Sequence, residues 1–214
     1  MASILDLLNS DIGKTLINGT SQQLGQDKAK TTTALNAALP LLLGAMKNNA
    51  KTPEGANGLL GALGNDKHSG GILDNLGNIL GGSNIDEDVL QDGAGILRHV
   101  FNGKEQNVAS AVSKSSGLDA GSAMNALKVA APVLMGLLGK ETRQQNVADQ
   151  NGIGNLLSGL LGGESQQQES MVTRLLDADN DGSVIDDVAG MLLNGGGSKK
   201  GGIGGLLSGL LGKK

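Results

Sequence analysis

The sequence contains no cysteine, tryptophan or tyrosine, and its one phenylalanine is Phe101. Without cysteine there is no disulfide framework, no thiolate metal site and no cysteine nucleophile. Without large aromatic rings, the core must be built from Leu, Ile, Val, Ala and Met, so we expect a modest core. Only two histidines occur, and no Ser/His/Asp order or phosphate-binding loop is present. We therefore expect a protein that is not an enzyme.

Long hydrophobic runs and an excess of basic charge are also missing. No stretch reaches the ~18 consecutive apolar residues that predict a membrane span. The N-terminus has no basic region and carries an acid at Asp6, which is atypical of a signal peptide. The net charge of −4 disfavours a broad nucleic-acid surface. These features predict a soluble, cytoplasmic protein.

Glycine is abundant, with 36 glycines in 214 residues, whereas there are only three prolines. The glycines have no Gly-x-y period, and they separate short leucine-rich segments rather than forming one long linker. This composition predicts an all-α protein whose helices are joined by glycine breaks.

Two segments of the chain repeat each other. Residues 21–44 and 113–136 align without gaps and share nine of 24 positions, which indicates an internal duplication. The shared pairs are Ser21/Ser113, Gly25/Gly117, Asp27/Asp119, Ala34/Ala126, Leu35/Leu127, Ala38/Ala130, Pro40/Pro132, Leu42/Leu134 and Gly44/Gly136.

Each copy predicts a corner between two helices. In the first copy a helix should end at Gly25 and the next should begin at Asp27, whose carboxylate can accept backbone N–H groups. Pro40 then lies far inside the second helix, so we expect a kink or a split there, and the same at Pro132.

Each half continues with a Leu/Gly helix and then a polar loop. The Leu/Gly helices are expected at 52–64, where Thr52 and Pro53 form a start signal, and at 151–163. We predict a first helical module at 1–85 with a degenerate loop, a second at 86–194 with an acidic loop, and a Gly-rich linker with an amphipathic tail at 195–214.

The acidic loop "DADNDGSVIDD" at 177–187 has spacing suited to a cation. Acids at loop positions 1, 3 and 5 and a glycine at position 6 match the first half of an EF-hand loop, and the oxygen ligands favour Ca²⁺ over Mg²⁺. Position 12 is Val188 instead of glutamate, which predicts weak binding. The alternative is a solvated turn that starts a helix. The candidate ligands are Asp177, Asp179, Asp181, Ser183 and Asp186.

The matching loop at 65–75 has lost the acids. Lys67 and Ser69 stand where the second copy has aspartates, so we expect no cation there. We interpret His68 as a surface turn residue and His99 as a helix-face residue beside Phe101.

The two corners also resemble a helix-turn-helix. Reading a major groove needs basic and amide side chains on the second helix. The first copy offers Lys28 and Lys30, but the second copy offers no equivalent basic pair. We therefore favour a packing corner over a nucleic-acid interface.

The tail contains a second, closer repeat. "GIGNLLSGLLG" at 152–162 recurs as "GIGGLLSGLLG" at 202–212, with ten of eleven residues identical. The pattern places one apolar stripe on a helix, which predicts docking on another copy or on a protein partner. Contact with a membrane surface is the alternative for the tail. For the mid-chain copy we expect a core helix.

The order of these features resembles the bacterial family called domain of unknown function 937 (DUF937), to which YidB-like proteins look related. The carriers include "TTTALNAALPLLLGAM", "TPEGANGLLGALG", "DGAGILRHVFNG", "VASAVSKSSGLDAGSAMNAL", "APVLMGLLGK" and "LLDADNDGSVIDDVAGML". The resemblance implies an all-helical bacterial protein, supports possible cation ligation in the second loop, and implies no activity.

We therefore expect a non-enzymatic helical protein that binds one Ca²⁺ through an EF-hand-like loop. The alternative is a protein of helical self-assembly, partner docking or membrane-surface contact that holds no metal.

Overall fold

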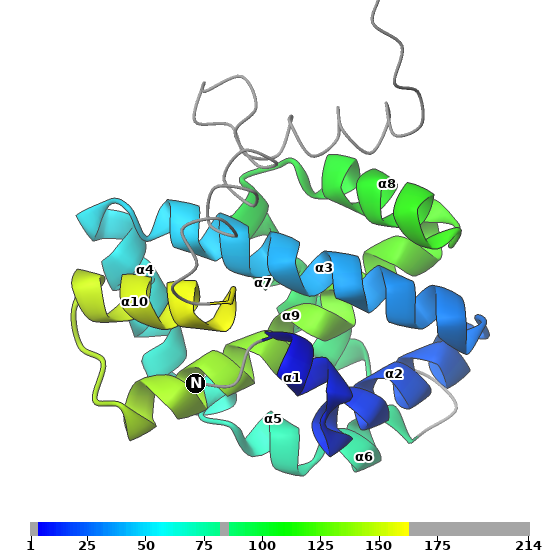
Figure 1. Cartoon of the computed structure of the whole chain (residues 1–214), viewed down its shortest axis with the longest axis horizontal. Helices are drawn as coiled ribbons and strands as arrows, with labels where there is room; N and C mark the ends of the chain where they lie inside the picture. Colours follow the sequence, from blue (N-terminus) through cyan, green and yellow to red (C-terminus); the bar gives the residue numbers. More distant parts are fainter. Residues whose placement is uncertain (1–3, 82–85, 163–214) are drawn as a thin grey trace, which may run out of the picture.

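The computed structural model describes residues 4–81 and 86–162, and every regular element in these ranges is helical (Figure 1). The predicted all-α class is confirmed. The elements are α1 (Ile4–Asn9), α2 (Asp11–Leu24), α3 (Lys28–Asn49), α4 (Pro53–Gly64), the 3₁₀ helix η1 (Asp66–His68), α5 (Gly71–Asp74), α6 (Leu76–Leu80), α7 (Glu87–Phe101), α8 (Glu105–Ser116), α9 (Ala120–Gln144) and α10 (Gln150–Leu160).

The long helix α9 runs through the middle of the molecule. It packs against α3, α7 and α8 and against the shorter elements α4, η1 and α5, so most other helices reach it (Figure 1). Among the described helices, α9 alone is long and apolar enough to cross a membrane by length and composition. However, 67% of its most apolar window is buried inside the molecule, as in the core helix of a folded domain.

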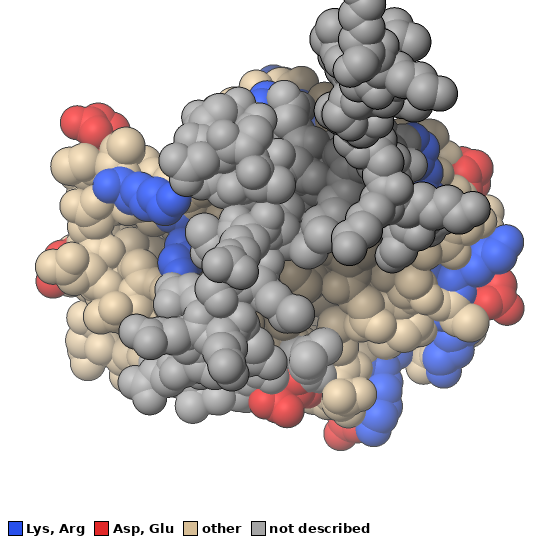
Figure 2. Space-filling view, turned by 45° about the horizontal axis from the view of Figure 1, so that its top comes forward, with Lys and Arg blue, Asp and Glu red and all other residues tan. Residues whose placement is uncertain are grey.

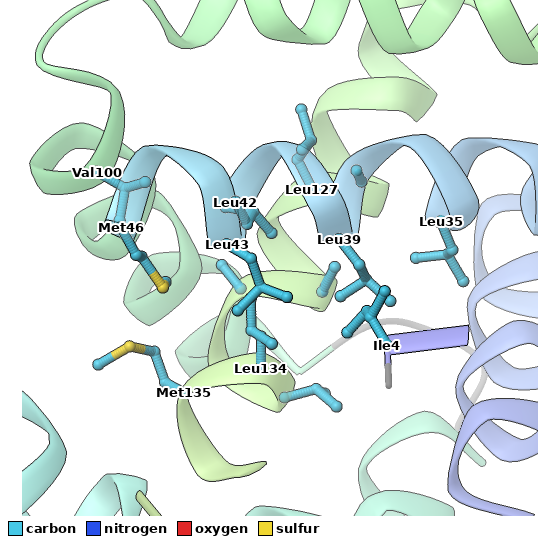
Figure 3. Close-up of a cluster of buried hydrophobic side chains, with 14 of the residues drawn as sticks. Ile4, Leu35, Leu39, Leu42, Leu43, Met46, Val100, Leu127, Leu134 and Met135 are labelled. Carbon is cyan, nitrogen blue, oxygen red and sulfur yellow. The ribbon is translucent and has the colours of Figure 1, made fainter. Parts of the chain in front are cut away.

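One hydrophobic core joins both predicted modules. It consists of aliphatic side chains, methionines and the buried ring of Phe101, as the composition requires. In its middle the α3 residues face α9, with Ile4 of α1 beside them (Figure 3). This cluster includes Leu35, Leu39, Leu42 and Leu43 from α3 and Leu127, Leu134 and Met135 from α9.

The two predicted corners form as the sequence indicates. Gly25 and Gly117 end α2 and α8 in the left-handed conformation, with φ of 59° and 71°. Asp27 and Asp119 then cap α3 and α9 by accepting backbone N–H groups of the first turn. The corners share this geometry, and the duplication itself stays a prediction.

The internal prolines do not split their helices. α3 continues past Pro40 and α9 continues past Pro132, so the alternative of a split helix is wrong. The helical turns before and after each proline are packed in the core, and this packing outweighs the single lost hydrogen bond. These two helices supply the largest share of the core.

Pro132 has a further effect on packing. It has no N–H, so the carbonyl of Lys128, four residues earlier, lacks its intrahelical donor. The backbone of Gly93 in α7 lies directly against this carbonyl, and a Cβ at Gly93 would overlap the Lys128 oxygen. A glycine is therefore required where α7 crosses α9.

Candidate functional site

The predicted cation ligands lie outside the described residues, as does the tail at 195–214. Within residues 4–81 and 86–162, no group of three or more His, Cys, Asp or Glu side chains is placed to hold a metal ion. The calcium site therefore stays a prediction. Its ligands are Asp177, Asp179, Asp181, Ser183 and Asp186.

The matching loop at 65–75 is described, and it makes a sharp turn. The side chain of Asn65, at loop position 1, accepts a hydrogen bond from the N–H of Lys67 at 3.0 Å. Gly70, at loop position 6, has a φ of +104°, which disfavours any residue with a Cβ. Helix α5 begins directly afterwards at Gly71. The loop thus has the turn and the helix start that the repeat predicts.

This loop packs closely against two glycines of α9. Gly136 lies against the side chain of Ile72, and Gly139 lies against the backbone carbonyl of His68. A Cβ at either glycine would approach its neighbour closer than 3.0 Å, a separation that Cβ atoms essentially never show. From the last turn of α9, Arg143 donates to the carbonyl of Gly64 at 3.2 Å.

His68 is buried, so its assignment to the surface was wrong. Its side chain lies between α4 and α7, where Nδ1 is 2.9 Å from the carbonyl oxygen of Ala62 and Nε2 is 3.3 Å from Oδ2 of Asp92. The two bonds join a loop to helices on either side of it. His99, by contrast, is exposed on α7 as predicted.

The two corners contact each other. Gln26, between α2 and α3, donates from Nε2 to Ser122 Oγ at 3.2 Å and to Asp119 Oδ2 at 3.4 Å. The pKa of the Asp119 carboxyl group is lowered, most strongly by a hydrogen bond from the Ser122 hydroxyl and next by one from the Ser122 N–H. The corner residues are therefore engaged in packing and capping.

Charge is mixed over the part of the surface seen in Figure 2. Basic side chains lie beside acidic ones over the described elements that are visible in this view (Figure 2). Lys28 and Lys30 are exposed in the first turn of α3. The geometry of the corners is what the packing interpretation predicts, and nucleic-acid binding stays untested.

Helix α10 packs against three other helices through one apolar face. This helix lies in a seat formed by α3, α4 and α9 (Figure 1), and the prediction of a core helix here is confirmed. Asp149 caps it by accepting from Gly152 N at 2.8 Å. Gln150 donates from Nε2 to the carbonyl oxygens of Lys51 and Ala50, at 2.7 and 3.2 Å.

The apolar face of α10 is almost completely buried in this seat. Four side chains point into the core, and burial of each such side chain contributes about 1.5–3 kcal/mol. Their exposed fractions are 0% for Ile153, 1% for Leu156, 0% for Leu157 and 4% for Leu160.

These features define an all-helical protein organised around one apolar central helix, with a Leu/Gly helix held in a seat on its surface. The chain belongs to the family of bacterial proteins of unknown function DUF937, which it matches over residues 6–141. No curated protein and no solved structure matches it.

Proposed function

We propose that this protein is not an enzyme and that it works by docking Leu/Gly helices, on a second copy of itself or on another protein. The observation that carries this proposal is the seat of α10, where a short Leu/Gly helix is held by one apolar face and two end contacts. Because the tail repeats this helix almost residue for residue, the chain has a second segment of the same docking chemistry.

Three polar side chains of the described core support a structural role. The hydroxyls of Thr142 and Ser116 donate to carbonyls one turn earlier in their own helices, at 2.7 Å in each case. The ring of His68 bonds to a backbone carbonyl and to one carboxylate. These side chains stabilise helices and their junctions, which is the work expected of a docking scaffold.

Sedimentation velocity of the full chain over a range of concentrations tests this proposal. We expect association that increases with concentration and that is lost in a Leu206→Asp/Leu207→Asp variant. The matched control is Gly205→Asn, which changes the one position where the two repeats differ and should associate like the wild type. A monomer at every concentration would contradict self-docking. Liposome flotation, with and without residues 195–214, tests the membrane alternative.

A second function, binding of one Ca²⁺ by the loop at 177–187, is favoured by the geometry of the described loop at 65–75. There, Gly70 makes the sharp turn and α5 starts at the next residue. Gly182 holds the same place in the acidic copy, where the acids at positions 1, 3 and 5 would supply the oxygen ligands.

Calorimetry with Ca²⁺ and with Mg²⁺ tests this second function. Wild-type protein should release heat with Ca²⁺, and the Asp177→Asn/Asp181→Asn variant should release none. The control is Asp66→Asn/Asp74→Asn in the loop that lacks the acidic pattern, and it should bind like the wild type. Equal and negligible heats for wild type and variant would rule out the site.

A further inference from the structure

The two Leu/Gly repeats differ at one position, and this position is exposed on α10. Asn155 is exposed on α10, and Gly205 replaces it in the tail. Every buried position of α10 is occupied by the same residue in the tail. The matching pairs are Ile153/Ile203, Leu156/Leu206, Leu157/Leu207 and Leu160/Leu210.

A seat that accepts α10 therefore offers the tail the same apolar contacts. The contact buries apolar side chains at four positions of α10, and these positions are identical in both segments. The glycines at 152, 154 and 159 also recur, at 202, 204 and 209.

We propose that the seat formed by α3, α4 and α9 is a binding site for residues 202–212 of the same chain, which replace α10 there. The exchange releases the apolar face of α10 for docking elsewhere. This inference rests on the proposed docking function, since it names the segment and the seat involved.

The residues just before each repeat determine which segment occupies the seat in the wild-type protein. α10 has an N-cap at Asp149 and two hydrogen bonds from Gln150 to the carbonyl oxygens of Ala50 and Lys51, the two residues after α3. The corresponding tail residues are Lys199 and Lys200, which cannot act as an acidic cap or place an amide there. α10 is thus the stronger occupant, and the tail binds when α10 is displaced or weakened.

The intervening chain is long enough for the exchange. Residues 163–201 separate the two repeats, and a segment of that length would extend roughly 60 Å even at the helical rise of ~1.5 Å per residue. α10 itself is only about 16 Å long at the same rise. A covalent connection raises the effective concentration of the tail at the seat, which favours the tail of the same chain over that of another.

A double-mutant cycle on the full chain tests the proposal. The Leu156→Asp/Leu157→Asp variant removes α10 from its seat, and the tail should then take its place. Adding Leu206→Asp/Leu207→Asp should lower the Tm of that variant by at least about 5 °C. The same tail substitutions in the wild-type background should leave the Tm unchanged, because α10 occupies the seat.

Equal effects of the tail substitutions in both backgrounds would overturn the proposal. If the aspartate variants do not fold, the cycle is repeated with alanine at the same four positions, where a coupling of the same sign is required. The melts are compared at several protein concentrations. A tail effect that increases with concentration would assign the seat to the tail of a second copy and would overturn the assignment to the same chain.

Cross-linking gives a second readout, and the absence of cysteine makes it specific. The Lys51→Cys/Gln150→Cys variant places two cysteines where α10 contacts the residues after α3; we call this the resident pair. The Lys51→Cys/Lys200→Cys variant places the second cysteine at the corresponding position of the tail; we call this the tail pair. With a short bis-maleimide, the resident pair should cross-link within one chain in the wild-type background. The tail pair should do so once Leu156→Asp/Leu157→Asp is present, and no intrachain product there would refute the exchange.

The two proposals fail separately. If the protein stays monomeric but shows the coupling and the tail cross-link, the exchange is supported and self-docking is refuted. If the protein self-associates but shows neither the coupling nor the tail cross-link, the docking function is supported and the exchange is refuted.

Discussion

Two glycines on α7 differ only in what stands opposite them, and they allow the packing of α7 on α9 to be tested directly. A Cβ at Gly93 would overlap the carbonyl oxygen of Lys128, whereas a Cβ at Gly95 would meet nothing within 4 Å. We predict that Gly93→Ala destabilises the protein and that Gly95→Ala stabilises it.

The magnitude follows from two terms. Replacing glycine by alanine inside a helix gains up to about 1 kcal/mol from helix propensity, and both variants gain it. Only Gly93→Ala also forces the two helices apart, and overpacking of this kind costs about 1–3 kcal/mol. Neither partner at this contact is a side chain that could rotate away, so α7 itself must shift. The difference between the variants should therefore be about 1–3 kcal/mol.

Thermal unfolding followed by far-UV circular dichroism is the suitable assay, because the chain has no tryptophan or tyrosine. For a protein of this size 1 kcal/mol corresponds to roughly 2–4 °C, so Gly95→Ala should melt roughly 2–12 °C above Gly93→Ala. Equal melting temperatures, or a higher one for Gly93→Ala, would show that α7 does not approach the Lys128 carbonyl as described.

Three further predictions concern the loop and the corners. Gly70→Ala should lower stability by about 1–2 kcal/mol, since its φ is +104°, whereas Gly71→Ala should have little effect; chemical denaturation of both compares them. His68→Leu should cost about 1–3 kcal/mol in the same assay, and Asp92→Asn should cost less, because the Asp92 side chain is 31% exposed; the reverse order would contradict the buried pair. The pKa of Asp119 lies below its ordinary value of 3.8, so the stability from its ionised carboxylate is full above that pH and is lost as the pH falls through the lower, folded-state value. Melts from about pH 6 to about pH 3 should therefore show a steeper loss for wild type than for Asp119→Asn, and parallel curves would refute the assignment.

The local features of the fold were visible in the sequence. Gly25 followed by Asp27, and Thr52 followed by Pro53, mark helix ends because the groups they satisfy lie within one turn. Burial of α10 was also predictable, since its apolar residues keep a helical period. The effect of Pro40 and Pro132 was only partly so, because continuity of each helix depends on packing along its whole length.

The surroundings of His68 were not predictable from nearby residues. Its burial depends on Gly139 and Asp92, which belong to helices far along the chain. A glycine pair three residues apart on an apolar helix, such as Gly136 and Gly139, signals that some backbone approaches closely. It does not identify which backbone. The acidic loop has the opposite character, since its chemistry is legible in the spacing while its geometry lies outside the described residues.

The central place of α9 has a consequence for synthesis on the ribosome. The apolar face of α3 is complete at Asn49, but α9, one of the two helices that cover most of it, ends only at Gln144, roughly 100 residues later. At ~5–20 residues per second, the nascent chain exposes that face for roughly 5–20 s before its partner has been made. During this interval the leucines of α3 are accessible to chaperones and to other nascent chains, so the unfinished chain is more prone to aggregation than the folded protein.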